Sequence, residues 1–114
     1  MIDAESSALE IAAAVASGAA SAREITRAAL DRIDRLDVKY NCFTGITRDR
    51  ALAEAEAVDA KRAALRHDAV PGEALPPLAG VPYAVKNLAD IDGLATLPGS
   101  KINRDRPPAS RRGF

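Results

Sequence analysis

Lys86 is the residue whose type and setting offer the clearest chemistry. It follows an alternating run in which Val81, Tyr83 and Val85 are apolar, and this pattern places the lysine at the end of a short strand. Burial destabilises a lysine ammonium and lowers its pKa, so a buried lysine can accept a proton as a general base. The alternative is a side chain that extends from the strand end into solvent, and the spacing alone favours this alternative.

Few other side chains offer nucleophilic or metal chemistry. Cys42 has no cationic neighbour arranged to lower the pKa of its thiol, so we expect a small buried apolar residue rather than a nucleophile. With one cysteine and one histidine, His67, the sequence excludes an internal disulfide and a four-ligand zinc site. Ser6 and Ser7 stand at the start of a helical segment, where helix capping is the better explanation.

Charge and hydropathy exclude the commonest charge-driven partners. The chain has 114 residues with 16 basic and 16 acidic side chains, so its formal charge is zero. This gives no general attraction to nucleic acid or to an anionic membrane, and Arg111 with Arg112 does not supply one. No apolar run has the roughly 18 residues that a membrane-spanning helix needs. We therefore expect a cytoplasmic protein of one domain at most, or a piece of a larger one.

The first part of the chain is predicted to be helical. Ser7 with Glu10, and Ser21 with Glu24, have the spacing of a capping box. Apolar residues then recur at helical intervals, and Gly18 suits the C-terminal end of the first helix. The predicted helices cover residues 8–16, 22–38 and 48–66.

The second part is predicted to contain strands and loops. β-Branched and aromatic residues from Tyr40 to Ile46 predict a short strand, after which Thr47 offers an N-cap for the third helix. Prolines and glycines make residues 68–80 a connecting loop, and residues 81–85 predict a second strand. The predicted fold class is therefore α/β.

Two segments around Lys86 are similar to a known family. Residues 77–87 read PLAGVPYAVKN and residues 92–100 read DGLATLPGS, which in order and spacing resemble the start of the core of amidase signature enzymes. With the continuation GSKINRDRPP, they most resemble the biuret or carboxybiuret hydrolase branch. The common family form has aspartate where this chain has Asn87. The resemblance covers about residues 5–109.

The resemblance implies the N-terminal helices and first strands of the amidase mixed-sheet fold, truncated within a single domain. The implied organisation is a helical region over about 1–67, a loop over 68–80, the start of the catalytic core over 81–109 and a non-matching tail over 110–114.

The resemblance also implies hydrolysis of a C–N bond in a small amide by a Ser–cis-Ser–Lys triad, without metal or cofactor. Lys86 matches the lysine position, where it accepts a proton through a bridging serine while a second serine attacks the carbonyl. In the family both serines lie beyond the lysine, in a glycine- and serine-rich stretch that has no match here. We therefore expect this chain to be inactive alone. Ser100 is a weaker candidate, as a hydroxyl lining the substrate site.

Two alternatives stay open. The amidase subunit of a tRNA-dependent amidotransferase has the same lysine motif, although this chain lacks a basic surplus. The other is a non-catalytic helical module that binds a partner through Ile25, Ala29, Ile33 and Leu36, a stripe that would be core in a complete enzyme. The partners we expect are a small amide substrate, and either further copies of the chain or a small partner subunit, but neither nucleic acid nor membrane.

Overall fold

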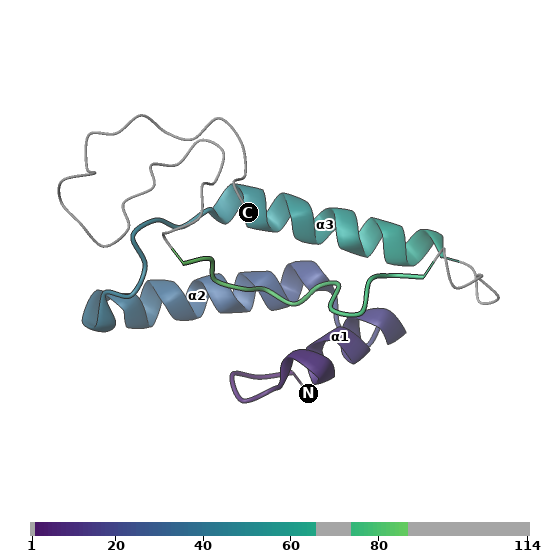
Figure 1. Ribbon diagram of the computed structural model, residues 1–114, viewed down its shortest axis with the longest axis horizontal. Coiled ribbons are helices and arrows are strands. Elements are labelled where there is room, and N and C mark those ends of the chain that lie inside the picture. Colours follow the sequence, from purple (N-terminus) through teal and green to yellow (C-terminus); the bar gives the residue numbers. More distant parts are fainter. Residues whose placement is uncertain (1, 66–73, 87–114) are drawn as a thin grey trace. The chain divides into compact units, whose positions relative to one another are not determined.

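The computed structural model describes residues 2–65 and 74–86, and three helices account for most of them (Figure 1). α1 covers Ala8–Ser17, α2 covers Ala22–Tyr40 and α3 covers Arg48–Ala64. The three predicted helices are thus confirmed, with only their C-terminal ends displaced. Within the described ranges, no helix has both the length and the apolar character needed to cross a membrane.

Side-chain caps begin the first two helices, as the spacing predicts. Ser7 Oγ accepts a hydrogen bond from the Glu10 amide at 3.2 Å, and the Glu10 carboxylate accepts one from the Ser7 amide at 2.9 Å. α1 then ends at Gly18, whose φ of 82° is the left-handed conformation that glycine adopts without steric cost. Ser21 Oγ caps α2 by accepting from the Glu24 amide at 3.0 Å.

α2 and α3 form an antiparallel helical hairpin. Arg48, the first residue of α3, forms an ion pair with Asp34 in the second half of α2. At the other end of the hairpin, Asp59 of α3 accepts hydrogen bonds at the start of α2. α3 also packs against α1.

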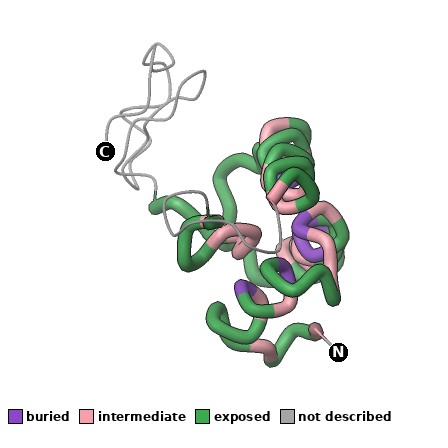
Figure 2. The backbone as a smooth tube through the Cα atoms, turned by 90° about the vertical axis from the view of Figure 1, so that its right-hand side faces the viewer, coloured by how far each residue is buried: buried purple, intermediate pink, exposed green. Residues whose placement is uncertain are grey.

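The core between the helices is small and aliphatic. Val15 of α1 is fully buried, and it clusters with Ala22, Ile25 and Ala55 from the other two helices. Figure 2 shows buried positions in each of the three helices. The partly buried residues packed against this cluster are Ile2, Ile11, Ala20 and Val58. Because alanine contributes little apolar area, this core stabilises the helical unit only modestly.

The strand predicted over residues 40–46 is wrong. Tyr40 is the last residue of α2, and the amides of Cys42 and Phe43 donate to the carboxylate of Asp37. These amides therefore find an acceptor within the chain segment itself and do not take part in a β-ladder. The expected burial of Cys42 is also wrong, since this residue is exposed.

The strand predicted over residues 81–85 is also absent from the structure. The Val81 amide donates to the Leu78 carbonyl at 3.2 Å, which closes a turn, and residues 81–86 have no ladder hydrogen bonds. Alternating side chains are not sufficient for a strand, because its backbone must pair with a neighbour. Among the described residues, the fold is helical. Thr47 begins α3 as predicted, but its side chain makes no capping hydrogen bond.

Candidate functional site

Lys86 is the last described residue of the second part of the chain. The chain divides into two compact units, residues 1–82 and 83–114, and within the second unit the structure describes residues 83–86. The Lys86 side chain is exposed, and so are Tyr83 and Val85. The burial that would make this lysine a base is therefore not supplied by the described residues. Ser100 and His67 lie outside the described residues.

The segment that leads to Lys86 is anchored on the helical unit at Gly80. Gly80 has a φ of +87°, and a Cβ added there would lie 2.7 Å and 2.9 Å from the two methyl carbons of Val15. Val15 is the fully buried residue at the centre of the core. The PLAGVPYAVKN motif thus needs glycine at this position for two reasons, the positive φ and the close approach to α1.

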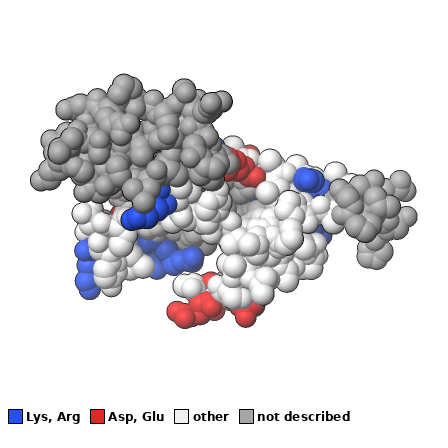
Figure 3. All heavy atoms as spheres, in the orientation of Figure 1, with Lys and Arg blue, Asp and Glu red and all other residues white. Residues whose placement is uncertain are grey.

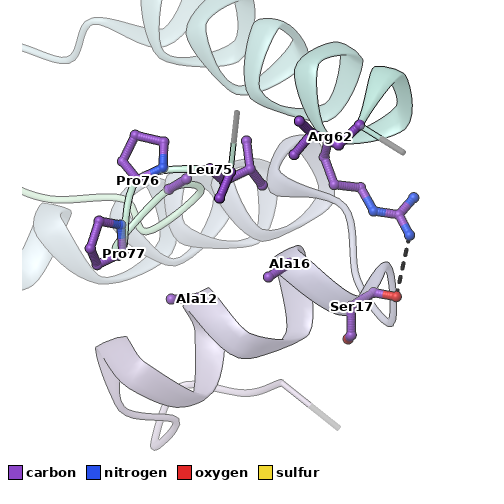
Figure 4. A pocket seen from close by; sticks show the side chains of 10 residues that line it. Ala12, Ala16, Ser17, Arg62, Leu75, Pro76 and Pro77 are labelled. Carbon is purple, nitrogen blue, oxygen red and sulfur yellow. Dashed lines mark hydrogen bonds between the residues drawn. The ribbon is translucent and has the colours of Figure 1, made fainter. Parts of the chain in front are cut away.

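A pocket of about 540 Å³ lies where α1, the end of α3 and residues 74–79 meet. Most of its described lining residues have apolar side chains, Ala12 and Leu75 among them (Figure 4). The one charged side chain among its described lining residues is Arg62, whose Nη2 donates to the Ser17 carbonyl at 3.2 Å. No described lining residue is a carboxylate, histidine or lysine, so the described walls offer no general base.

The hydrogen bonds of Asp59 could not be predicted from the sequence. Its carboxylate accepts from the amides of Ala22 and Arg23, at 2.7 Å and 3.0 Å, and these are the first two residues of α2. The contact joins residues far apart in the sequence, so no local pattern indicates it. Arg23 also forms an ion pair with Glu56, one turn before Asp59 in α3, and because both side chains are partly exposed this pair adds little stability.

Comparison with known proteins identifies the family of this chain. The sequence profile of the Amidase family matches residues 24–111, a range that contains Lys86. The chain is 54% identical over 101 residues to the AtzE subunit of the 1-carboxybiuret hydrolase of Pseudomonas sp. strain ADP, covering 89% of this chain and 21% of that protein. It is 48% identical over 95 residues to a glutamyl-tRNA(Gln) amidotransferase subunit of Streptomyces avermitilis, covering 83% and 18%.

A solved structure has a similar backbone. It comes from work on a vestigial protein complex and the evolutionary origins of an s-triazine catabolic enzyme, and it matches with a TM-score of 0.83 and 50% identity. The match covers 94% of this chain and 22% of the solved chain, so this chain spans about a fifth of the length of its relatives. The family match extends over most of the sequence and includes the lysine motif, and the chain belongs to the amidase family.

Proposed function

We propose that this chain is the N-terminal segment of an amidase-type hydrolase that cleaves C–N bonds in small amides. The observation that supports the proposal most strongly is the family match over residues 24–111, with Lys86 inside it. The high identity to a 1-carboxybiuret hydrolase subunit favours biuret-like or carboxybiuret-like substrates.

In the proposed mechanism Lys86 is the general base of a Ser–cis-Ser–Lys triad. The neutral lysine accepts a proton through the bridging serine, and the second serine attacks the amide carbonyl. The C–N bond then breaks as the leaving nitrogen takes a proton, and water releases the acyl group from the serine. The serines come from the part of an amidase domain that follows the matched segment.

The exposure of Lys86 fits a segment that works only within a complete domain. A lysine base must be desolvated, because water stabilises the ammonium form and prevents the side chain from accepting a proton. Lys86 is exposed among the described residues, so in the proposed mechanism other parts of the domain have to cover it. We therefore expect activity from the complete domain.

The amidase subunit of a tRNA-dependent amidotransferase is the second candidate. Several relatives at 43–48% identity are glutamyl-tRNA(Gln) amidotransferase subunits, which favours this reading. The zero formal charge of the chain favours a small substrate instead, because a tRNA-facing segment gains affinity from basic side chains.

A chimaera tests the role of Lys86. This chain replaces the matched N-terminal segment of the Pseudomonas 1-carboxybiuret hydrolase subunit, and hydrolysis of 1-carboxybiuret is measured. We expect activity, and we expect Lys86→Ala to lower kcat by about 10²- to 10⁴-fold or more. Lys61→Ala removes an exposed lysine of α3 and is the matched control, with kcat unchanged.

Two outcomes would change the assignment. A loss confined to KM would make Lys86 a binding residue, and equal kcat in both variants would remove it from the site.

A parallel chimaera with the Streptomyces amidotransferase protein, assayed for amide transfer to glutamyl-tRNA(Gln), tests the second candidate. Activity in that chimaera alone would favour the amidotransferase reading.

A further inference from the structure

The pocket between α1, the end of α3 and residues 74–79 has the size and the apolar lining of a small-molecule site. Ala12 and Ala16 line it from α1, Leu65 lines it directly after α3, and Leu75 lines it from the segment that follows. Its volume of about 540 Å³ lies within the range of about 300–1,000 Å³ that is typical of such sites. A ligand would therefore make mainly apolar contacts with the described walls.

The Arg62 guanidinium is fixed at the C-terminal end of α1. Its Nη2 donates to the Ser17 carbonyl at 3.2 Å, and Figure 4 shows the side chain extending from α3 to Ser17. A Cβ added at Gly18 would overlap with Nη2 and Cζ of Arg62, so the guanidinium lies directly against this glycine. Because Arg62 is already oriented, binding a ligand costs less side-chain entropy.

The positive charge of Arg62 has no carboxylate partner in the part of the chain that the structure describes. The ion pairs there are formed by Arg23, Arg48 and Arg50. The C-terminal end of a helix offsets only about half an elementary charge. On the face shown in Figure 3, basic side chains lie over the end of α3, whereas acidic side chains gather near the start of α1.

The guanidinium also has hydrogen-bond donors left for a ligand. A guanidinium has five N–H donors, and the bond to the Ser17 carbonyl uses one of them. Their planar arrangement suits a carboxylate, whose two oxygens can both accept. No described lining residue is a carboxylate, so the described walls do not repel an anion.

We propose that this pocket binds a small aliphatic monocarboxylate, with the carboxylate on Arg62 and the aliphatic chain against the apolar walls. Lys86 is not among the described lining residues, so the site is separate from the lysine motif. The proposal does not depend on the proposed function, because it needs neither the serines nor the amide chemistry.

Titration of the full 114-residue chain with octanoate, followed by isothermal calorimetry, tests the site. We expect saturable binding, which Arg62→Ala weakens by about 10- to 100-fold because the charged hydrogen bonds are lost. Lys61→Ala is the matched control, since it removes the same charge from the neighbouring, exposed residue and should leave the dissociation constant unchanged. Arg62→Lys keeps the charge and should bind octanoate more tightly than Arg62→Ala does.

A second variant tests the pocket without changing Arg62. Ala16→Leu places a larger side chain in the wall and should weaken octanoate binding by about tenfold, with helicity unchanged by circular dichroism. Ala13→Leu is its control, because Ala13 is an exposed residue of α1 outside the described lining.

Three results would overturn the proposal. The first is the absence of saturable octanoate binding by the wild-type chain. The second is an equal dissociation constant for Arg62→Ala and Lys61→Ala. The third is binding of octan-1-ol as tight as that of octanoate, which would show that the carboxylate makes no specific contact.

Discussion

The carboxylate of Asp59 in α3 accepts a hydrogen bond of 2.7 Å from the amide of Ala22, the first residue of α2. Its second oxygen accepts from the Arg23 amide, and Ser21 Oγ accepts from the Glu24 amide. The first three amides of α2, which have no partner within the helix, are thus all satisfied by side chains. The negative charge also lies at the helix N-terminus, where the helix dipole stabilises an anion.

We expect Asp59→Ala to destabilise the α2–α3 hairpin by about 1–2 kcal/mol, since it leaves two helix amides without their acceptor. Urea titration followed by far-ultraviolet circular dichroism measures the midpoint at which helicity is lost. Asp31→Ala is the control, because it removes an exposed carboxylate of α2 and should leave the midpoint unchanged. Equal midpoints for the two variants would show that the Asp59 contact contributes nothing to stability.

Gly80→Ala should destabilise the packing of the chain around Gly80 on α1 by about 1–3 kcal/mol. The new methyl group would lie 2.7 Å from a methyl carbon of Val15. A residue with a Cβ would also have to adopt a positive φ, which is strained. Gly45→Ala is a matched control, because Gly45 has no positive φ and no atom within 4 Å of an added Cβ. The melting temperatures of both variants are measured in the chimaera with the Pseudomonas protein. A Gly80→Ala variant as stable as the Gly45→Ala control would contradict the role of Gly80 in packing on α1.

The helices could be predicted because their signals are local. The capping box of Ser7 and Glu10, the left-handed Gly18 and the Ser21 cap are all present where the sequence places them. Each signal depends on residues within one turn of the helix end, so neither the rest of the chain nor a partner is needed to form it.

The two strand predictions were wrong because a strand is not a local structure. Its alternating pattern resembles that of any extended segment, and only a paired backbone makes it a strand. Asp37 shows how a side chain competes for the amides of Cys42 and Phe43. The contact of Asp59 with Ala22 could not be predicted for the same reason, since it joins segments distant in sequence.

The candidate site remains a prediction from the lysine motif. The family match confirms the relationship over residues 24–111, a range that contains Lys86. Lys86 is exposed, and Ser100 lies outside the described residues. In the proposed mechanism Lys86 acts together with two serines, and neither serine is among the described residues that surround it.

We expect the isolated chain to hydrolyse no amide, because a lysine without its bridging serine and nucleophile has no acyl-enzyme route. The purified chain is assayed against biuret and simple amides beside its Lys86→Ala variant, and both should equal the uncatalysed rate. Turnover that disappears in the Lys86→Ala variant would mean that the chain contains a complete catalytic set.

We also expect the isolated chain to lose its helicity over a broad temperature range. The buried apolar residues of the described part are Ala12, Val15, Ala22, Ile25, Leu30 and Ala55, half of them alanines. At about 25 cal/mol per Å² of buried apolar surface, such a core offsets little of the roughly 1–2 kcal/mol of backbone entropy that each ordered residue loses.

Large apolar side chains that could enlarge this core remain exposed, with Leu9 at 74% and Leu78 at 54%. Melting followed by circular dichroism, with amide proton dispersion measured by nuclear magnetic resonance, checks the expectation. A sharp cooperative transition of a monomer with well-dispersed amide signals would contradict it. Residues 1–114 would then form an autonomous domain, and a helical interaction module would explain the chain better than an incomplete hydrolase.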